Sequence, residues 1–468
     1  MNTYIKLSFL ALAAMFTSCG DSFLDLQQEK NQRVPNTMED FQKLLYQTNV
    51  MNESAPVGLA NIGADEYWVT DAQWASTTGF QPVQFQKNAY VWADEIYVGG
   101  ETLTGWDNAY SAIYRTNLGL EFVAKTPRTA ENGVAWDQLK SSALFMRALN
   151  FYQLAQVFCP VYSTENSNLP YGLPLREETD PTVGVPRSTV GETYEKIIAD
   201  INEALPLLPN KGENVYRPSK AAAYALLSRV YMDMGDYTLA EKAADDCLAI
   251  QSELLDYTTV PVKQTTLMTF AANGVGNPEI IYMNSSALTS FLNWYHPDTT
   301  LVRSYGVGDA RTKLFFQDTT VTKVKDLTIF KGNYKGTNNA TTFTGFATDE
   351  IYLNRAESRA RNQNLTGALL DLNSLRQKRF FSENFVPLES TKSEEVLSWI
   401  LEERRKELIL RGTRWSDLRR LNKEAKYAKT LVRVVGGERY ELKPESNKWT
   451  WPIMLEAVLM GDYVQNPR

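Results

Sequence analysis

The stretch from Ser219 to Ile250, SKAAAYALLSRVYMDMGDYTLAEKAADDCLAI, decides how the rest of the chain is interpreted. Its apolar residues recur at helical spacing on both sides of a central Met-Gly-Asp turn, which predicts two helices folded back on each other. Small side chains at Ser228, Ala240 and Cys247 let the two backbones approach closely, as a tetratricopeptide pair requires. One such pair cannot bury both of its faces, so it implies stacked neighbours. An ordinary helical hairpin is the alternative.

A second hairpin of the same kind is expected at 349–378. Ala356 and Ala368 are twelve residues apart, which matches the spacing of Ser228 and Ala240. This repetition favours stacked repeats over a single hairpin. Helical periodicity also predicts helices at 37–51 with Thr37 as N-cap, 106–125, 136–158, 188–208 with Ser188 as N-cap, and 394–421. The predicted fold class is therefore mostly α, a tetratricopeptide-like scaffold with long irregular, loop-rich insertions.

The order of these segments predicts how the chain is divided. Both insertions are rich in Gly, Asn and Thr and carry many large aromatic rings, and long ordered loops often carry function. Short β-like runs are expected at 279–283 and 327–334. The expected parts are a signal peptide (1–18), a tether (19–36), an N-terminal helical region (37–253) with an insertion at 52–105, a second irregular insertion (254–348), and a C-terminal helical region (349–468).

Composition narrows the classes of function. The chain has 468 residues, 43% of them hydrophobic, which is ample for a large buried core. Its net charge is -7 and it has no basic block, so nucleic-acid binding is not expected. A single histidine, His296, disfavours histidine-based catalysis and metal sites with several histidines. We expect no metal and no cofactor, and we expect His296 to be a loop residue without a special role.

The N-terminus carries the most specific short signal. Lys6 precedes an apolar run at 7–16, and Thr-Ser-Cys-Gly follows, which is typical of a signal peptide. The cysteine after this boundary, Cys19, resembles that of a bacterial lipobox, so we expect cleavage before it and a lipid anchor on it. A plain secretory signal is the alternative. The other two cysteines, Cys159 and Cys247, lie in apolar helical patterns and are expected to be free and buried.

Several blocks of the sequence resemble the SusD/RagB family. They are the lipoprotein start CGDSFLDLQQEK (19–30), SSALFMRALNFYQLAQVF (141–158), EIYLNRAESRARN (350–362), ILEERRKELILRGTRWSDLRR (400–420) and the ending YVQNPR (463–468). The resemblance implies an outer-membrane surface lipoprotein of Bacteroidetes, built on tetratricopeptide pairs with an irregular binding region. It also implies a partner, a SusC-like TonB-dependent transporter, and a captured nutrient that is usually a glycan. RagB-type relatives leave a peptide ligand open, and a scaffold that only docks the transporter is a third possibility.

Both insertions carry side chains that suit a saccharide. Aromatic faces stack on the apolar faces of sugar rings, while amides, carboxylates and arginine hold the hydroxyls. The candidate ligand-binding residues are Asn61, Asp65, Tyr67, Trp68 and Trp74 in the first insertion, and Asn293, Trp294, Tyr295 and Arg303 in the second. For each tryptophan the alternative is that the ring packs its insertion onto the scaffold.

No local pattern suggests an enzyme. The chain has no Gly-x-Ser-x-Gly, no HExxH and no P-loop, although 55 acidic residues make some close carboxylate pair inevitable. The resemblance also argues against hydrolysis, so no catalytic residue is expected. Arg147 and Glu357 lie in apolar helices and are expected to be internal ion-pair partners. The charges within 402–407 are expected to form an exposed or semi-buried lattice of ion pairs.

Overall fold

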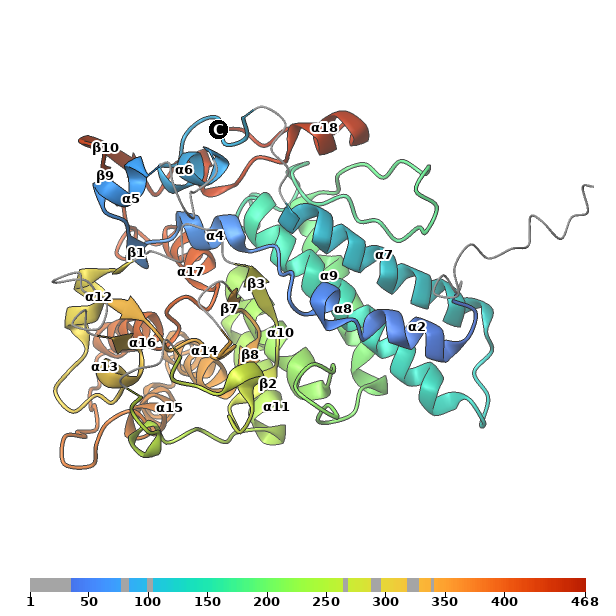
Figure 1. Cartoon of the computed structure of the whole chain (residues 1–468). Coiled ribbons are helices and arrows are strands. Elements are labelled where there is room, and N and C mark those ends of the chain that lie inside the picture. Colours follow the sequence, from blue (N-terminus) through green and yellow to red (C-terminus); the bar gives the residue numbers. More distant parts are fainter. Residues whose placement is uncertain are drawn as a thin grey trace, which may run out of the picture.

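The computed structural model describes residues 35–76, 84–98, 104–263, 268–287, 296–317, 328–337 and 341–468. Long antiparallel helices form the scaffold, and the irregular segments and short strands lie beside it (Figure 1). Cys19, Asn293, Trp294 and Tyr295 lie outside the described residues. Within the described part of the chain, no helix is both long and apolar enough to cross a membrane.

The helices of the N-terminal part are shorter than the helical periodicity of the sequence predicts. The helix expected at 37–51 is two helices, α2 (Met38–Leu45) and α3 (Thr48–Met51), separated at Tyr46 and Gln47. Thr37 is the N-cap of α2, as expected, and forms a capping box with Asp40. In the described part of the loop-rich insertion, short helices follow: α4 (Gly58–Gly63), α5 (Asp71–Ala75) and α6 (Gln84–Tyr90).

Helices α7 (Thr104–Lys125), α8 (Gly133–Phe158) and α9 (Val190–Ala204) form the next layer. Every residue of α8 from Ser141 to Phe158 is buried, so this part of the helix is packed on all sides. Arg147 on α8 donates to both carboxylate oxygens of Asp200 on α9, at 2.7 and 2.8 Å, so its expected internal ion pair is present. The N-cap of α9 is Thr189 and not Ser188, because Glu192 completes its capping box three residues later.

The hairpin at 219–250 forms as predicted. Helix α10 (Lys220–Met234) begins after the N-cap Ser219, and α11 (Tyr237–Ile250) begins after Asp236. Gly235 joins them with φ of 80°, a left-handed conformation that glycine adopts without strain. Ser228, Ala240 and Cys247 are fully buried where the helices meet their neighbours, and the Cys247 thiol donates to the carbonyl of Ala221.

The second hairpin also forms, and it builds a core of its own. Helices α14 (Thr348–Arg361) and α15 (Leu365–Gln377) pack with α16 (Ser393–Glu407) around a separate apolar cluster that includes Ala356 and Ala368. Helix α14 also packs on α11, and Arg355 on α14 bonds to Asp245 on α11 at 2.9 Å. The two hairpins are therefore stacked neighbours, as a tetratricopeptide scaffold requires.

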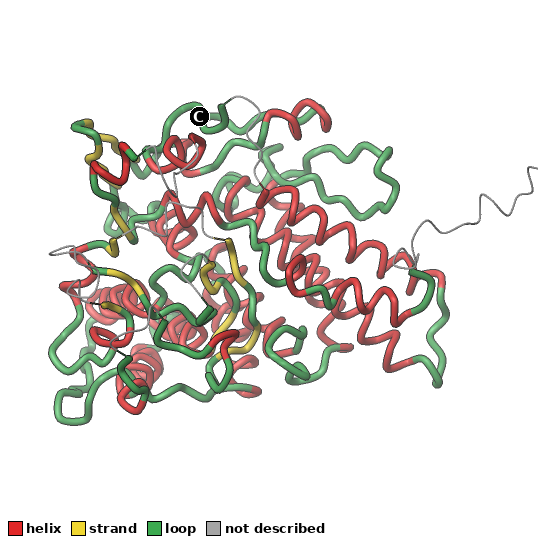
Figure 2. Tube along the Cα trace, in the orientation of Figure 1, coloured by secondary structure: helices red, strands yellow, loops and turns green. Residues whose placement is uncertain are grey.

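The second irregular segment is a set of short antiparallel ladders between loops (Figure 2). The β-like run at 279–283 contains β2, and the described part of 327–334 contains β6. The pairs are β2 (Ile280–Tyr282) with β8 (Phe346–Ala347), β3 (Ser285–Ala287) with β7 (Thr341–Phe343), β5 (Phe316–Gln317) with β6 (Ile329–Phe330), and β4 (His296–Pro297) with β1 (Tyr67–Trp68). Helices α12 (Thr299–Ser304) and α13 (Arg311–Leu314) and 3-10 turns at Tyr257–Thr259 and Ala272–Gly274 complete the segment.

The C-terminal part contains a hairpin that periodicity did not predict. After α17 (Arg414–Leu421), β9 (Leu431–Val435) pairs with β10 (Glu438–Leu442). Gly436 and Gly437 form the turn with φ of 63° and 82°, and this Gly-Gly dipeptide between alternating residues was the available signal. A 3-10 turn (Asn447–Trp449) and α18 (Leu455–Gly461) precede the end of the chain, which lies near α6 (Figure 1).

The last residues of the chain are hydrogen-bonded to the rest of the protein. Asn466 is buried, and its amide donates to the carbonyls of Phe158 at the end of α8 and of Trp451, at 2.8 and 2.7 Å. Arg468 donates to the carbonyl of Ala93. Asn466 and Arg468 therefore tie the end of the chain to the C-terminal end of α8 and to the loop after α6.

The charges of 402–407 lie deeper than expected. Glu403, Arg404 and Glu407 are buried, and Glu407 bonds to both Arg311 and Arg379, at 2.6 and 2.8 Å. Burial opposes ionisation, but the two guanidiniums outweigh it and lower the pKa of Glu407 to about 2. Such a network is a structural element, because removing one partner would leave an uncompensated buried charge.

Candidate ligand-binding site

The β1–β4 ladder brings the two aromatic insertions together. Tyr67 lies opposite Pro297, and Trp68 lies opposite His296. The centroids of the Trp68 and His296 rings are 5.0 Å apart, and the planes are tilted by 48°. Two segments more than two hundred residues apart in sequence therefore meet here, and we call this surface, in which Trp68 is half-buried and His296 lies buried beside it, the β1–β4 face. The sequence pointed to both segments but not to this pairing.

His296 holds a defined protonation state on this face. The backbone N–H of Thr70 is bonded to Gln73 Oε1, which turns the Gln73 amide nitrogen towards His296 Nε2 at 3.3 Å. The other ring nitrogen lies 3.3 Å from the carbonyl of Thr328 and can only donate to it. Burial lowers the pKa of His296, so the imidazole is neutral with its proton on Nδ1. His296 was expected to be a loop residue, but it lies in strand β4, where its ring contacts that of Trp68.

Trp68 is only half-buried, and its indole nitrogen has no acceptor among the described residues. Trp74 on α5 is also half-buried. The centre of its ring lies 5.8 Å from the centre of the Tyr90 ring and 5.6 Å from the ammonium of Lys87. The turn of the β9–β10 hairpin packs against Trp74 at Gly436. Both indoles therefore keep exposed surface while the scaffold fixes their positions.

The remaining candidates of the first insertion are engaged inside the protein. Asn61 is buried, and its amide lies 3.5 Å from the hydroxyl of Thr342. Tyr67 is buried, and its hydroxyl donates to the carbonyl of Ile62 at 3.3 Å. This placement favours a structural role for both side chains, beneath the face that Trp68 and Trp74 present.

Asp65 is the centre of an ion cluster. Arg414 donates to its two carboxylate oxygens at 2.6 and 3.0 Å, Lys429 bonds to it at 2.6 Å, and Arg405 lies at 3.6 Å. Burial alone would raise the pKa of Asp65, but Arg414 and the two other cations lower it well below the usual range. The carboxylate ties the first insertion to α16 and α17, and its oxygens are largely occupied.

Among the candidate ligand-binding residues of the second insertion, Arg303 is the one that the structure describes. It lies on α12, which starts directly after β4, and its side chain is exposed. Asp298 caps this helix by accepting from the N–H of Leu301 at 2.9 Å, and Arg405 bonds to Asp298 at 3.1 Å. Arg303 is thus an exposed cation on a short, fixed helix beside the aromatic face.

This arrangement suits binding by stacking and hydrogen bonding. Burial raises the pKa of Glu66 and Glu279 to about 7 and that of Asp233 to about 6, and these three carboxyls lie in the interior, away from a solvent-exposed substrate. Among the described residues, no three His, Cys, Asp or Glu side chains gather as metal ligands do. Cys159 and Cys247 are free and buried, and burial raises the pKa of both thiols, so they are unreactive.

Comparison with known proteins identifies the family. Residues 22–232 match a family model described as "Starch-binding associating with outer membrane", and residues 273–467 match the model of the SusD family. The chain is 26% identical over 374 residues to SusD-like protein P2 of Formosa agariphila, which covers 68% of this chain and 71% of that protein.

Solved structures share the fold. A SusD superfamily protein from Bacteroides thetaiotaomicron superposes with a TM-score of 0.72 at 20% identity, covering 92% of this chain and 100% of the other. A putative sugar binding protein from Bacteroides vulgatus gives a TM-score of 0.73 at 21% identity, covering 93% and 99%. The helical-repeat scaffold with irregular insertions is thus that of a known class of proteins. The chain belongs to the SusD/RagB family.

Proposed function

We propose that this chain is a cell-surface lipoprotein of the outer membrane that captures oligo- or polysaccharide and delivers it to a SusC-like TonB-dependent transporter. The observation that supports this most directly is the β1–β4 pairing, which places the half-buried Trp68 beside the neutral His296. An aromatic face with nearby amide and cationic groups is what a sugar chain needs for stacking and for holding its hydroxyls. The family model named for starch binding and the sugar-binding protein of similar fold agree with this proposal.

The ligand class is tested by calorimetry. The chain without its lipidated cysteine, residues 20–468, is titrated with plant, fungal and host glycans and with peptide mixtures. Trp68→Ala and Trp74→Ala should each weaken glycan binding about fivefold or more, as expected if one stacking ring contributes about 1 kcal/mol. Trp136→Ala is the matched control, since this half-buried indole lies on α8 and donates to the carbonyls of Val123 and Thr126.

The outcomes separate the alternatives. Binding of glycans that both site variants weaken without a lower melting temperature supports the proposal. Binding of peptides alone would show a peptide-capturing member of the family. Absence of any binding would leave a scaffold that docks the transporter.

The anchor and the transporter are tested in cells. Metabolic labelling with a clickable palmitate analogue should mark the chain, and Cys19→Ser should remove the label. Crosslinking on intact cells should recover a TonB-dependent transporter with the chain. A label that survives Cys19→Ser would contradict the anchor, and crosslinked material without such a transporter would contradict the delivery step.

A further inference from the structure

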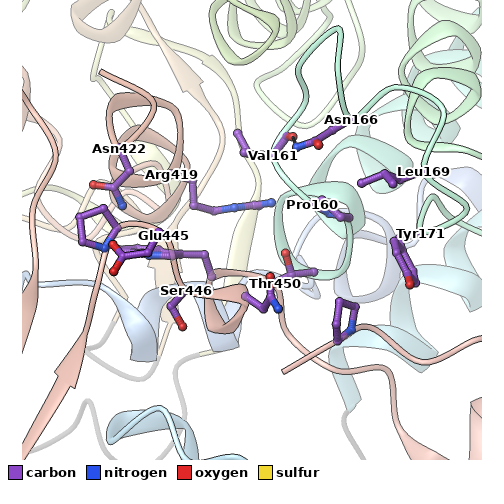
Figure 3. Close-up of a pocket in the computed structure, with 14 residues that line it drawn as sticks. Pro160, Val161, Asn166, Leu169, Tyr171, Arg419, Asn422, Glu445, Ser446 and Thr450 are labelled. Carbon is purple, nitrogen blue, oxygen red and sulfur yellow. Dashed lines mark hydrogen bonds between the residues drawn. The ribbon is translucent and has the colours of Figure 1, made fainter. Parts of the chain in front are cut away.

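A pocket of about 270 Å³ lies where three distant segments meet (Figure 3). The loop after α8, residues 160–171, forms one wall, and Arg419 of α17 and Asn422, directly after that helix, form the second. The third wall is the segment 444–450 after β10, with Pro467 from the end of the chain. The pocket shares no residue with the β1–β4 face, so it is a separate feature of the molecule.

The apolar part of this pocket is rigid. Trp449 stands in the wall with its ring 4.6 Å from that of Trp415, and its indole nitrogen donates to the carbonyl of Lys443 at 2.8 Å. Tyr171 and Leu169 lie on the opposite side from Asn422 and Glu445 (Figure 3). The pocket therefore combines fixed apolar rings with a polar side, as small-molecule sites do.

Two hydrogen-bond donors on residues that line the pocket are buried and find no acceptor in the part of the chain that the structure describes. Arg419 is 4% exposed, and its two terminal nitrogens donate to the carbonyls of Gln156 and Cys159. Its Nε has no acceptor among the described residues. The Oδ1 of Asn422 accepts from the backbone N–H of Lys429 at 3.0 Å, while its Nδ2 is buried and has no acceptor in the same part of the chain. Unpaired buried donors are rare, and a ligand oxygen is one way to satisfy them.

The charges around the pocket favour a neutral ligand. Glu445 is exposed at the pocket and forms no ion pair with any residue that the structure describes, so its carboxylate can accept from a hydroxyl. An anion would meet this carboxylate, and a cation would meet the Arg419 guanidinium. The volume lies just below the range of about 300–1,000 Å³ that holds drug-sized ligands, which fits one ring and not a chain.

We propose that this pocket, between the loop after α8, α17 and the segment after β10, binds a single neutral sugar residue. A sugar ring supplies both the acceptors that the Arg419 and Asn422 nitrogens lack and hydroxyl groups that can donate to Glu445, and its apolar face suits the rings of Trp449 and Tyr171 in the lining. The site is independent of the β1–β4 face, and it would stand even if that face bound no glycan.

The test uses the full lipoprotein, purified in a detergent without a sugar headgroup. Methyl glycosides of glucose, galactose and mannose are the probes, with methyl glucuronide as the charged comparison, and binding is followed by saturation-transfer NMR. Asn422→Asp keeps the acceptor for Lys429 but replaces the unpaired donor with an oxygen, so it should weaken the best neutral glycoside about tenfold or more. Val161→Phe fills the pocket and should abolish the same signal.

Trp136→Ala, whose indole does not line the pocket, is the control and should leave this binding unchanged. The proposal is overturned if none of the neutral glycosides binds, if the pocket variants that fold bind as the natural chain does, or if Trp136→Ala removes the signal. Tighter binding of the glucuronide than of the neutral glycosides would overturn the neutral assignment. Because Asn422→Asp is isosteric, it decides the question even if Val161→Phe does not fold.

Discussion

Glu66 should make the stability of this protein depend on pH, and Glu66→Gln should remove the part of that dependence that comes from Glu66. Glu66 lies between Asp65 and Tyr67 and is 2% exposed. One carboxylate oxygen accepts from the backbone N–H of Leu410 at 2.7 Å, and the other has no partner among the described residues. Burial raises the pKa of Glu66 from 4.5 to about 7, although the Leu410 N–H and Arg414 oppose the rise.

The sign and size of the effect follow from this pKa. Since the folded state holds the proton more tightly than the unfolded chain, the stabilisation is fully present below about pH 4.5 and is lost as the pH rises through about 7. A difference of about 2.5 pKa units corresponds to about 3 kcal/mol of unfolding free energy at pH 8. Glutamine keeps the acceptor for Leu410 and carries no charge, so the variant should gain this amount relative to the natural chain between pH 4 and pH 8.

Urea denaturation followed by tryptophan fluorescence at pH 4, 6 and 8 measures this difference. Comparing the two proteins at each pH cancels the contributions of the other titrating groups. Glu438→Gln, at an exposed position in β10, is the control and should show no such trend. A difference between Glu66→Gln and the natural chain that is the same at all three pH values would refute the reasoning.

Two further substitutions probe the packing. Gly63→Ala should lower the unfolding free energy by about 1–3 kcal/mol in the same assay, because a Cβ there would lie 2.6 Å from the Trp415 ring and 2.7 Å from the Trp451 ring. Glu357→Gln should cost about 3 kcal/mol or more, because the buried Arg420, which donates to both oxygens at 2.5 and 2.7 Å, would lose one of its two counter-charges and keep only Asp417.

Each of these substitutions has a matched control in the chain. Gly58 lies on the same helix as Gly63, but nothing lies within 4 Å of a Cβ at that position, so Gly58→Ala should leave stability nearly unchanged or slightly raised. Glu39→Gln breaks an exposed pair with Lys43 and should cost less than about 1 kcal/mol. Equal effects of test and control would contradict the packing argument in the first case and the buried-charge argument in the second.

The resemblance to the SusD/RagB family and the local sequence patterns together predicted the fold. Helical periodicity located both hairpins, and Gly235 and Asp236 fixed the turn of the first, because these signals act over a few residues. The sequence also predicted that Arg147 and Glu357 would form internal ion pairs, because a charge in an apolar helix needs a counter-charge. Which residue provides it, Asp200 or Arg420, was not visible in the sequence.

The sequence predicted the two regions that make up the candidate site. Only the tertiary structure showed which of their residues are engaged inside the protein and which keep exposed surface. The sequence by itself determined the helical scaffold and the aromatic character of both insertions, because spacing and residue type are local properties. It could not show that Asp65 would be tied to Arg414 and Lys429, which follow it by more than three hundred residues. Nor could it pair Trp68 with His296. Contacts between distant segments depend on how the helices stack. That stacking therefore decides which polar side chains are paired inside the protein and which stay available to a ligand.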